Sequence, residues 1–233
     1  MTTKRLFSAL LLLALFAMGV RETLDADMWW HLKTGEYILQ HGIPRTDVFS
    51  FTVPHHEWIT HEWLSQVIMW LIYRAAGFPG LIIVFAALIT LTFWLVYTVS
   101  GGRPYLAGFV VLLAAIASAI VWGARPQIFN LLLMAAFVHV IERVKKGTLS
   151  PGWLWLLPPL TLIWANLHSG YLLGVVLLRT YAVGETVQRW WQPLDNRSQP
   201  WPIIGRLWLA TAAAFLLAAV NPSGPAIWLY PFD

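Results

Sequence analysis

The chain has 233 residues, of which 58% are hydrophobic and only 11% are charged, and its formal net charge is +4. A soluble domain carries roughly 25% charged residues, so this composition excludes a soluble globular protein of this length. The sequence contains no cysteine, which excludes disulfides and thiolate metal sites. The composition therefore predicts an all-α membrane protein, because helices satisfy their own backbone hydrogen bonds in lipid.

Seven apolar stretches are candidate transmembrane helices: 6–22, 80–99, 104–122, 127–143, 152–167, 170–187 and 207–221. A spanning helix needs about 20 residues, fewer if it is short or broken. Lys4 and Arg5 precede the first stretch as in a signal peptide, but residues 18–22 offer a poor cleavage site, so we expect a retained span. Pro158 and Pro159 remove two backbone donors and should kink the fifth stretch.

The segment 62–76 is either another span or a helix lying flat on the membrane. At about 1.5 Å per residue its fifteen residues cover about 22 Å, which is short of a core of about 30 Å. If it lies flat, nine Lys and Arg residues fall inside and five outside; if it spans, four fall inside and ten outside. Because positive charge favours the cytoplasmic side, we expect an interfacial amphipathic helix near 62–76.

This topology predicts one membrane domain over 1–233. It consists of the first span, an outer loop over 23–79, six further spans over 80–221 and an outer tail over 222–233. A second interfacial helix is expected near 28–41, closed by Gly42. The histidines and carboxylates of the outer loop, Arg125, and the polar residues after 165 then share one face. Such convergence is what an outward-facing active site requires.

The loop 21–62 holds seven of the eleven acidic residues and five of the seven histidines. Asp25 and Asp27 directly follow the first span, where an unpaired carboxylate near lipid is costly. They are therefore candidate catalytic residues or metal ligands, although Asp27 also stands where a helix N-cap belongs. Asp27 and His31 are four residues apart and can point to one side of a helix.

His31, His61 and Glu62 could join these carboxylates around a divalent metal, since imidazole and carboxylate suit several metals. The alternative is that these side chains hydrogen-bond the loop backbone. For the histidines this alternative is the stronger interpretation. Asp27 and His31 are the candidate metal ligands, and no other cofactor is expected.

Arg125 and Gln127 flank a proline at the outer end of the third span. An arginine there could clamp phosphate oxygens or could anchor the helix at the interface. Asn166 and His168 stand at the outer junction of the next two spans. Intramembrane polar residues are candidates for function, although such side chains also bond neighbouring helices. We take Arg125, Gln127, Asn166, His168, His61 and Glu62 as candidate substrate-binding residues.

Five segments resemble a group of bacterial membrane proteins: DADMWWHLKTGE at 25–36, GIPRTDVFSFT at 42–52, HEWL at 61–64, RPQ at 125–127 and WANLHSG at 164–170. Those proteins in turn look like integral-membrane glycosyltransferases of the C-type (GT-C) superfamily. That superfamily includes oligosaccharyltransferases, protein O-mannosyltransferases and lipid A aminoarabinose transferases. The resemblance covers nearly the whole chain, which looks like the N-terminal module of such proteins because relatives usually continue beyond Asp233.

The resemblance implies seven shared membrane helices and a first outer loop with two flat helices. It also implies a sugar donor carried on polyprenyl phosphate and a catalytic base at Asp25 or Asp27, with a divalent metal bound in some members. The expected place is a bacterial inner membrane, with the N-terminus cytoplasmic and the active face periplasmic. The expected partners are membrane lipid and the polyprenyl-phosphate-linked sugar, with no nucleic acid. Partner subunits are expected if the chain is naturally truncated.

Two other functions remain open. One is a non-catalytic membrane subunit or scaffold that retains the GT-C-like fold. The other is a transporter, which predicts internal symmetry and ionisable groups at mid-membrane. The sequence shows no such repeat, and only Arg179 lies clearly in the middle of a span.

Overall fold

The computed structural model describes residues 2–22, 26–53, 56–192 and 198–230. Its α-helices are α1 (Thr3–Gly19), α2 (Asp27–His41), α3 (Trp63–Val99), α4 (Pro104–Ser118), α5 (Gln127–Lys145), α6 (Leu157–Leu167), α7 (Tyr171–Trp191) and α8 (Trp201–Ala218). Three short 3-10 helices are η1 (Ala119–Val121), η2 (Pro151–Leu156) and η3 (Gly224–Trp228). No strand occurs in these four ranges, apart from one isolated bridge between Thr46 and Glu57, so the prediction of an all-α fold is confirmed for them.

Four helical stretches are long and apolar enough to cross a membrane among the described residues. They are α3, α4 with η1, α5 and α8. Large apolar side chains are exposed on the outer surface of the bundle, for example Leu13 on α1, Phe109 on α4 and Leu209 on α8. Exposed apolar area of this extent is unfavourable in water and favourable in lipid. These features indicate that the chain associates with a membrane.

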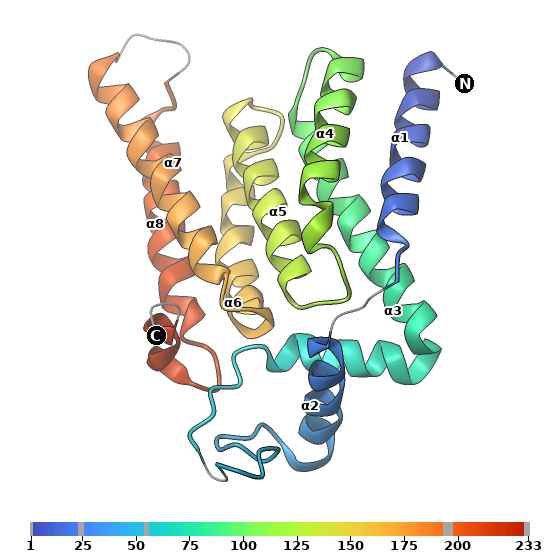
Figure 1. The fold of residues 1–233 in the computed structure, drawn as a ribbon. Coiled ribbons are helices and arrows are strands. Elements are labelled where there is room, and N and C mark those ends of the chain that lie inside the picture. Colours follow the sequence, from blue (N-terminus) through green and yellow to red (C-terminus); the bar gives the residue numbers. More distant parts are fainter. Residues whose placement is uncertain (1, 23–25, 54–55, 193–197, 231–233) are drawn as a thin grey trace.

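Helix α3 is divided by a sharp bend at Gly77 (φ 63°, ψ −160°), which is a conformation that favours glycine. Pro79 follows and limits continuation of the first part, since it provides no backbone donor. Residues 63–76 run across one end of the bundle, and residues 78–99 run along it (Figure 1). The part that the sequence analysis expected to lie flat is therefore perpendicular to the other helices.

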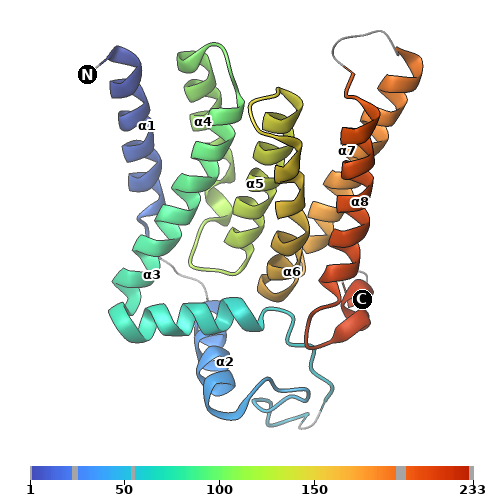
Figure 2. The ribbon, with the colours of Figure 1, turned by 180° about the vertical axis from the view of Figure 1, so that it is seen from behind.

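Helix α2 differs from the expectation of a second flat helix. Figures 1 and 2 show it extending away from the end of the bundle, beneath the crosswise part of α3. A Cβ on Gly35 would lie 2.1 Å from the carbonyl oxygen of Gln66, so α2 crosses α3 in backbone contact at this glycine. Trp30 of α2 packs on Phe49 and Trp58 of the following loop. Because α2 is buried against α3 and this loop, it does not lie flat as the sequence analysis expected.

The interior of the bundle is built by apolar contacts that link helices far apart in sequence. Phe85 of α3 packs edge-on against Phe129 of α5, and Phe137 of α5 packs against the fully buried Trp164 of α6. Helix α8 packs against both α6 and α7. The last helix begins at Trp201, earlier than the expected 207, because Pro200 and Pro202 stand at positions where proline favours helix initiation.

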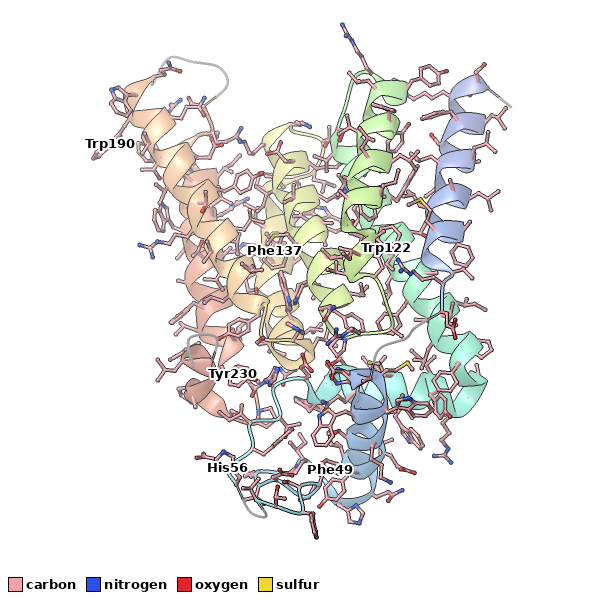
Figure 3. All side chains as sticks on the ribbon, in the orientation of Figure 1. Phe49, His56, Trp122, Phe137, Trp190 and Tyr230 are labelled. Atoms are coloured by element: carbon pink, nitrogen blue, oxygen red, sulfur yellow. The ribbon has the colours of Figure 1, made fainter. Side chains whose placement is uncertain are left out.

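The two ends of the bundle differ in chemistry. One end carries described basic residues from five helix termini and loops: Lys4, Arg5, Arg103, Arg143, Lys145, Lys146, Arg189 and Arg206. The opposite end carries α2, the loop 42–62, the turns 122–127 and 168–170, and the C-terminal residues (Figure 1). Figure 3 shows Trp190 at the basic end and Tyr230, Phe49 and His56 at the opposite end.

Candidate active site

The partly buried carboxylate of Glu62 is the centre of a histidine cluster at the non-basic end of the bundle. Glu62 is the residue before α3, and only 13% of its side chain is exposed. Its Oε1 lies 3.2 Å from Nε2 of His168 and 3.5 Å from Nε2 of His61. Its Oε2 lies 3.6 Å from Nδ1 of His31. The cluster thus joins α2, the end of the 42–62 loop and the α6–α7 turn around one carboxylate.

The hydrogen bonds of His168 fix its tautomer. Its Nδ1 accepts the backbone N–H of Gly170 at 3.0 Å, so this nitrogen cannot carry a proton. The side-chain amide of Asn130 donates to the same nitrogen at 2.9 Å, and the carbonyl oxygen of Asn130 accepts from the indole of Trp164 at 2.6 Å. The proton of neutral His168 is therefore on Nε2, which donates to Glu62.

Electrostatics in the cluster favour an ionised Glu62 and a neutral His168. Burial acts to raise the pKa of Glu62, but the hydrogen bond and charge of His61, with the charges of His168 and His31, outweigh burial and lower it. Burial lowers the pKa of His168, and the nearby Arg125 contributes in the same direction while Glu62 opposes it. At neutral pH Glu62 is therefore an anion that accepts a hydrogen bond from an uncharged imidazole.

His61 presents its second nitrogen to the centre of the cluster. Its Nδ1 donates to the carbonyl oxygen of Ile59 at 3.2 Å, and its Nε2 faces Oε1 of Glu62 at 3.5 Å. The hydroxyl of Tyr230 lies 3.4 Å from this Nε2. Burial, and then the charge of Glu62, raise the pKa of Tyr230, so its hydroxyl keeps its proton at neutral pH.

His31 is buried between α2 and the crosswise part of α3. The amide nitrogen of Gln66 lies 3.4 Å from its Nδ1, and Gln66 is itself buried. Because Gly35 brings α2 into backbone contact with α3 one turn later, the position of His31 depends on that close approach. The helix crossing therefore holds the third imidazole beside Glu62.

Asp27 forms an ion pair with Arg125, which joins the start of α2 to the loop before α5. The carboxylate Oδ2 accepts from the guanidinium, and 60% of the Asp27 side chain is exposed. Asp27 is the first residue of α2, and Ala26 occupies the cap position. The capping interpretation of Asp27 is therefore wrong, and its contact is with a cation that the sequence analysis also selected.

The remaining predicted site residues differ in what they can do. Asn166 uses its full hydrogen-bonding capacity: its oxygen accepts from Trp63 and Asn221, and its nitrogen donates to the carbonyl oxygens of Leu162 and Val220. It ties three helix ends together and has no hydrogen bond left for a substrate. Gln127 is partly buried as the first residue of α5. Asp25 lies outside the described residues.

The predicted metal ligands have different partners. Asp27 faces the positively charged Arg125, whereas His31 faces Glu62 and Gln66. A guanidinium bonded to a carboxylate competes with a cation for the same oxygens. No group of three or more histidine, aspartate or glutamate side chains is arranged to hold a metal ion in the part of the chain that the structure describes. The residues therefore do not fit a metal held by Asp27 and His31.

Sequence analysis missed two residues of the cluster. Asn130 lies one turn into α5, and a polar side chain inside an apolar stretch is a signal that could have identified it. Tyr230 follows the last helix, on the same end as Glu62 (Figure 3). Only the fold shows that this tyrosine reaches His61, since 169 positions separate the two in sequence.

No family model, no curated protein and no solved structure matches the chain.

Proposed function

We propose that the protein is a membrane-embedded glycosyltransferase that moves a sugar from a polyprenyl-phosphate donor to an acceptor hydroxyl at the outer face of a bacterial inner membrane. The observation that carries the proposal is the placement of a partly buried anionic carboxylate, Glu62, and a cation, Arg125, at the same end of an apolar bundle. The sequence resemblance supplies the donor class.

The chemistry needs a base and an anion-binding group. The acceptor oxygen attacks the anomeric carbon of the sugar, the bond from that carbon to the phosphate oxygen breaks, and the phosphate leaves with the electron pair. Glu62, backed by His61, takes the hydroxyl proton, since general bases act within hydrogen-bond reach. Arg125, oriented by Asp27, stabilises the charge on the leaving phosphate.

This assignment moves the base from the aspartates to Glu62. Asp27 is held by Arg125, whereas Glu62 is largely buried and surrounded by imidazoles. His168 cannot serve as the base because both of its ring nitrogens are engaged, with Nδ1 accepting from Gly170 and Nε2 donating to Glu62. Its role is to hold the carboxylate in place.

We further propose seven membrane crossings, by α1, residues 78–99 of α3, α4, α5, η2 with α6, α7 and α8. Arg179 lies on the exposed side of α7, which offers no support for a transport path through the bundle. The basic end faces the cytoplasm under this proposal, as the excess of Lys and Arg there favours.

Cysteine labelling tests this orientation without background, because the chain has no cysteine of its own. We expect a membrane-impermeant maleimide to label Thr52→Cys, an exposed position in the 42–62 loop, in intact cells. Ser150→Cys, exposed at the basic end, should react only after the membrane is permeabilised. The reverse pattern, or labelling of both in intact cells, would disprove the orientation.

Binding of a polyprenyl phosphate to the purified full chain tests the donor class. Replacing Arg125 by Gln should weaken binding about 10- to 100-fold, because a hydrogen bond to a charged group contributes about 1.5–3 kcal/mol. The matched control is Arg74→Gln, an exposed arginine on the crosswise part of α3, which should bind as the wild type does. A wild-type chain that binds no polyprenyl phosphate but co-purifies stoichiometrically with other membrane proteins would favour the scaffold instead.

A further inference from the structure

A second polar cavity lies at the basic end of the bundle, far from Glu62. It has a volume of about 270 Å³, is open to the surface, and is bordered by the ends of α1, α3, α4 and α5. Lys4 of α1 and Arg143 of α5 line it from two sides, and Thr98, Ser100 and the Gly101–Gly102 turn line it between them. The cavity therefore combines two cations with a polar turn.

The charged side chains that line this cavity are both positive. Among the described residues that line it, none is acidic. The Nε of Arg143 donates to the hydroxyl of Thr148 at 3.2 Å, which holds the guanidinium at the end of α5. Lys146 donates to the carbonyl oxygen of Val99 at 2.7 Å, which links the residue after α5 to the last residue of α3. An anion in the cavity would thus meet positive charge without a competing carboxylate.

A shallow groove continues from the cavity along the outer surface of α4. Ser100, Gly101, Gly102 and Ala107 line both, and the groove extends past Arg103 to the apolar side chains of Leu106 and Val110. Both of these side chains are more than half exposed on the face of α4 that is turned away from the bundle. A ligand that fits both parts has an anionic head and an apolar chain.

We propose that this cavity binds the phosphate of an anionic phospholipid, with one acyl chain lying along α4 over Leu106 and Val110. Charge complementarity selects the head group, since basic pockets between helices recognise anionic lipid head groups. The continuity of the groove with the cavity selects a lipid over a free phosphate. The site is separate from the proposed transferase site, because it occupies the opposite end of the bundle.

Lipid binding to the purified full chain, measured by native mass spectrometry with phosphatidylglycerol and phosphatidylcholine as probes, tests the proposal. The double variant Lys4→Gln/Arg143→Gln should bind phosphatidylglycerol about 30-fold more weakly, as expected for two cations at about 1 kcal/mol each. The variant Lys4→Arg keeps the positive charge and should bind as the wild type does. Such binding would show that substitution at this position does not itself prevent folding. The matched control is Arg5→Gln, which removes a neighbouring charge on α1 that does not line the cavity.

Three results would overturn the proposal. One is unchanged binding of phosphatidylglycerol by the double variant, and another is an equal loss in Arg5→Gln, which would indicate diffuse charge attraction. The third is equal affinity for phosphatidylcholine. Inorganic phosphate serves as a competitor: displacement of the lipid by micromolar phosphate would identify a free-anion site and contradict the lipid assignment.

Discussion

Replacing Glu62 by Gln should reduce sugar transfer from a polyprenyl-phosphate donor by about 10²- to 10⁴-fold, the range that a positioned general base contributes. Gln keeps an oxygen that accepts from Nε2 of His168, so the contact at 3.2 Å and the fold around it are retained. What is lost is the negative charge and the ability to take a proton. The measurement is release of polyprenyl phosphate from radiolabelled donor by the purified chain in liposomes.

The control for this variant is Glu36→Gln on α2. Glu36 pairs with Lys33 at 2.8 Å near the protein surface, so the same chemical change there should leave transfer within about twofold of wild type, as for exposed ion pairs. Binding of polyprenyl phosphate should be unchanged in Glu62→Gln, which separates this residue from Arg125. Wild-type transfer rates in Glu62→Gln would show that the carboxylate is structural and that the base lies elsewhere.

Replacing Gly35 by Ala should detach α2 from α3. The added Cβ would lie 2.1 Å from the carbonyl oxygen and 2.6 Å from the carbonyl carbon of Gln66, and backbone atoms cannot move aside as a side-chain end can. Overpacking of this kind costs about 3 kcal/mol. We expect the amides of α2 to exchange with deuterium about 100-fold faster, since local opening is governed by the stability of that contact.

Gly184→Ala in α7 is the matched control, because nothing lies within 4 Å of the Cβ it would add. Alanine favours a helix over glycine by about 1 kcal/mol, so this variant should be neutral or slightly more stable. Transfer activity should fall in Gly35→Ala, because His31 leaves Glu62 together with α2. Unchanged exchange of the α2 amides would mean that the crossing accommodates the added methyl group without cost and that this close approach does not position the site.

Much of the helical layout could be read from the sequence, because apolar length and glycine or proline boundaries are local signals. The expected stretches 80–99 and 152–167 correspond closely to the part of α3 after Gly77 and to η2 with α6. Pro158 and Pro159 do not kink a continuous helix. They stand in the first turn of α6, after the 3-10 turn η2, where the missing donors cost little.

The roles of individual site residues were less predictable, since they depend on contacts between distant segments. Glu62 was grouped with substrate-binding residues, yet the α6–α7 turn and α2 make it the shared partner of three histidines. Asn166 has the side chain of a binding residue, but its four hydrogen bonds, three of them to other helix ends, use its full hydrogen-bonding capacity. Spacing along the chain cannot separate these two outcomes.

The bend at Gly77 makes residues 63–76 a separate helical segment, and Glu62 lies at the end of this segment that is distant from the bend. At 1.5 Å per residue the segment is about 21 Å long, so a rotation of about 5° at the bend displaces its distant end by about 2 Å. That displacement is enough to break the contact between Glu62 and His168. The hydrogen bond from the Trp63 indole to Asn166 therefore restrains the start of α3. A change in the tilt of residues 78–99 would displace the Glu62 carboxylate by an amount that grows with the length of residues 63–76.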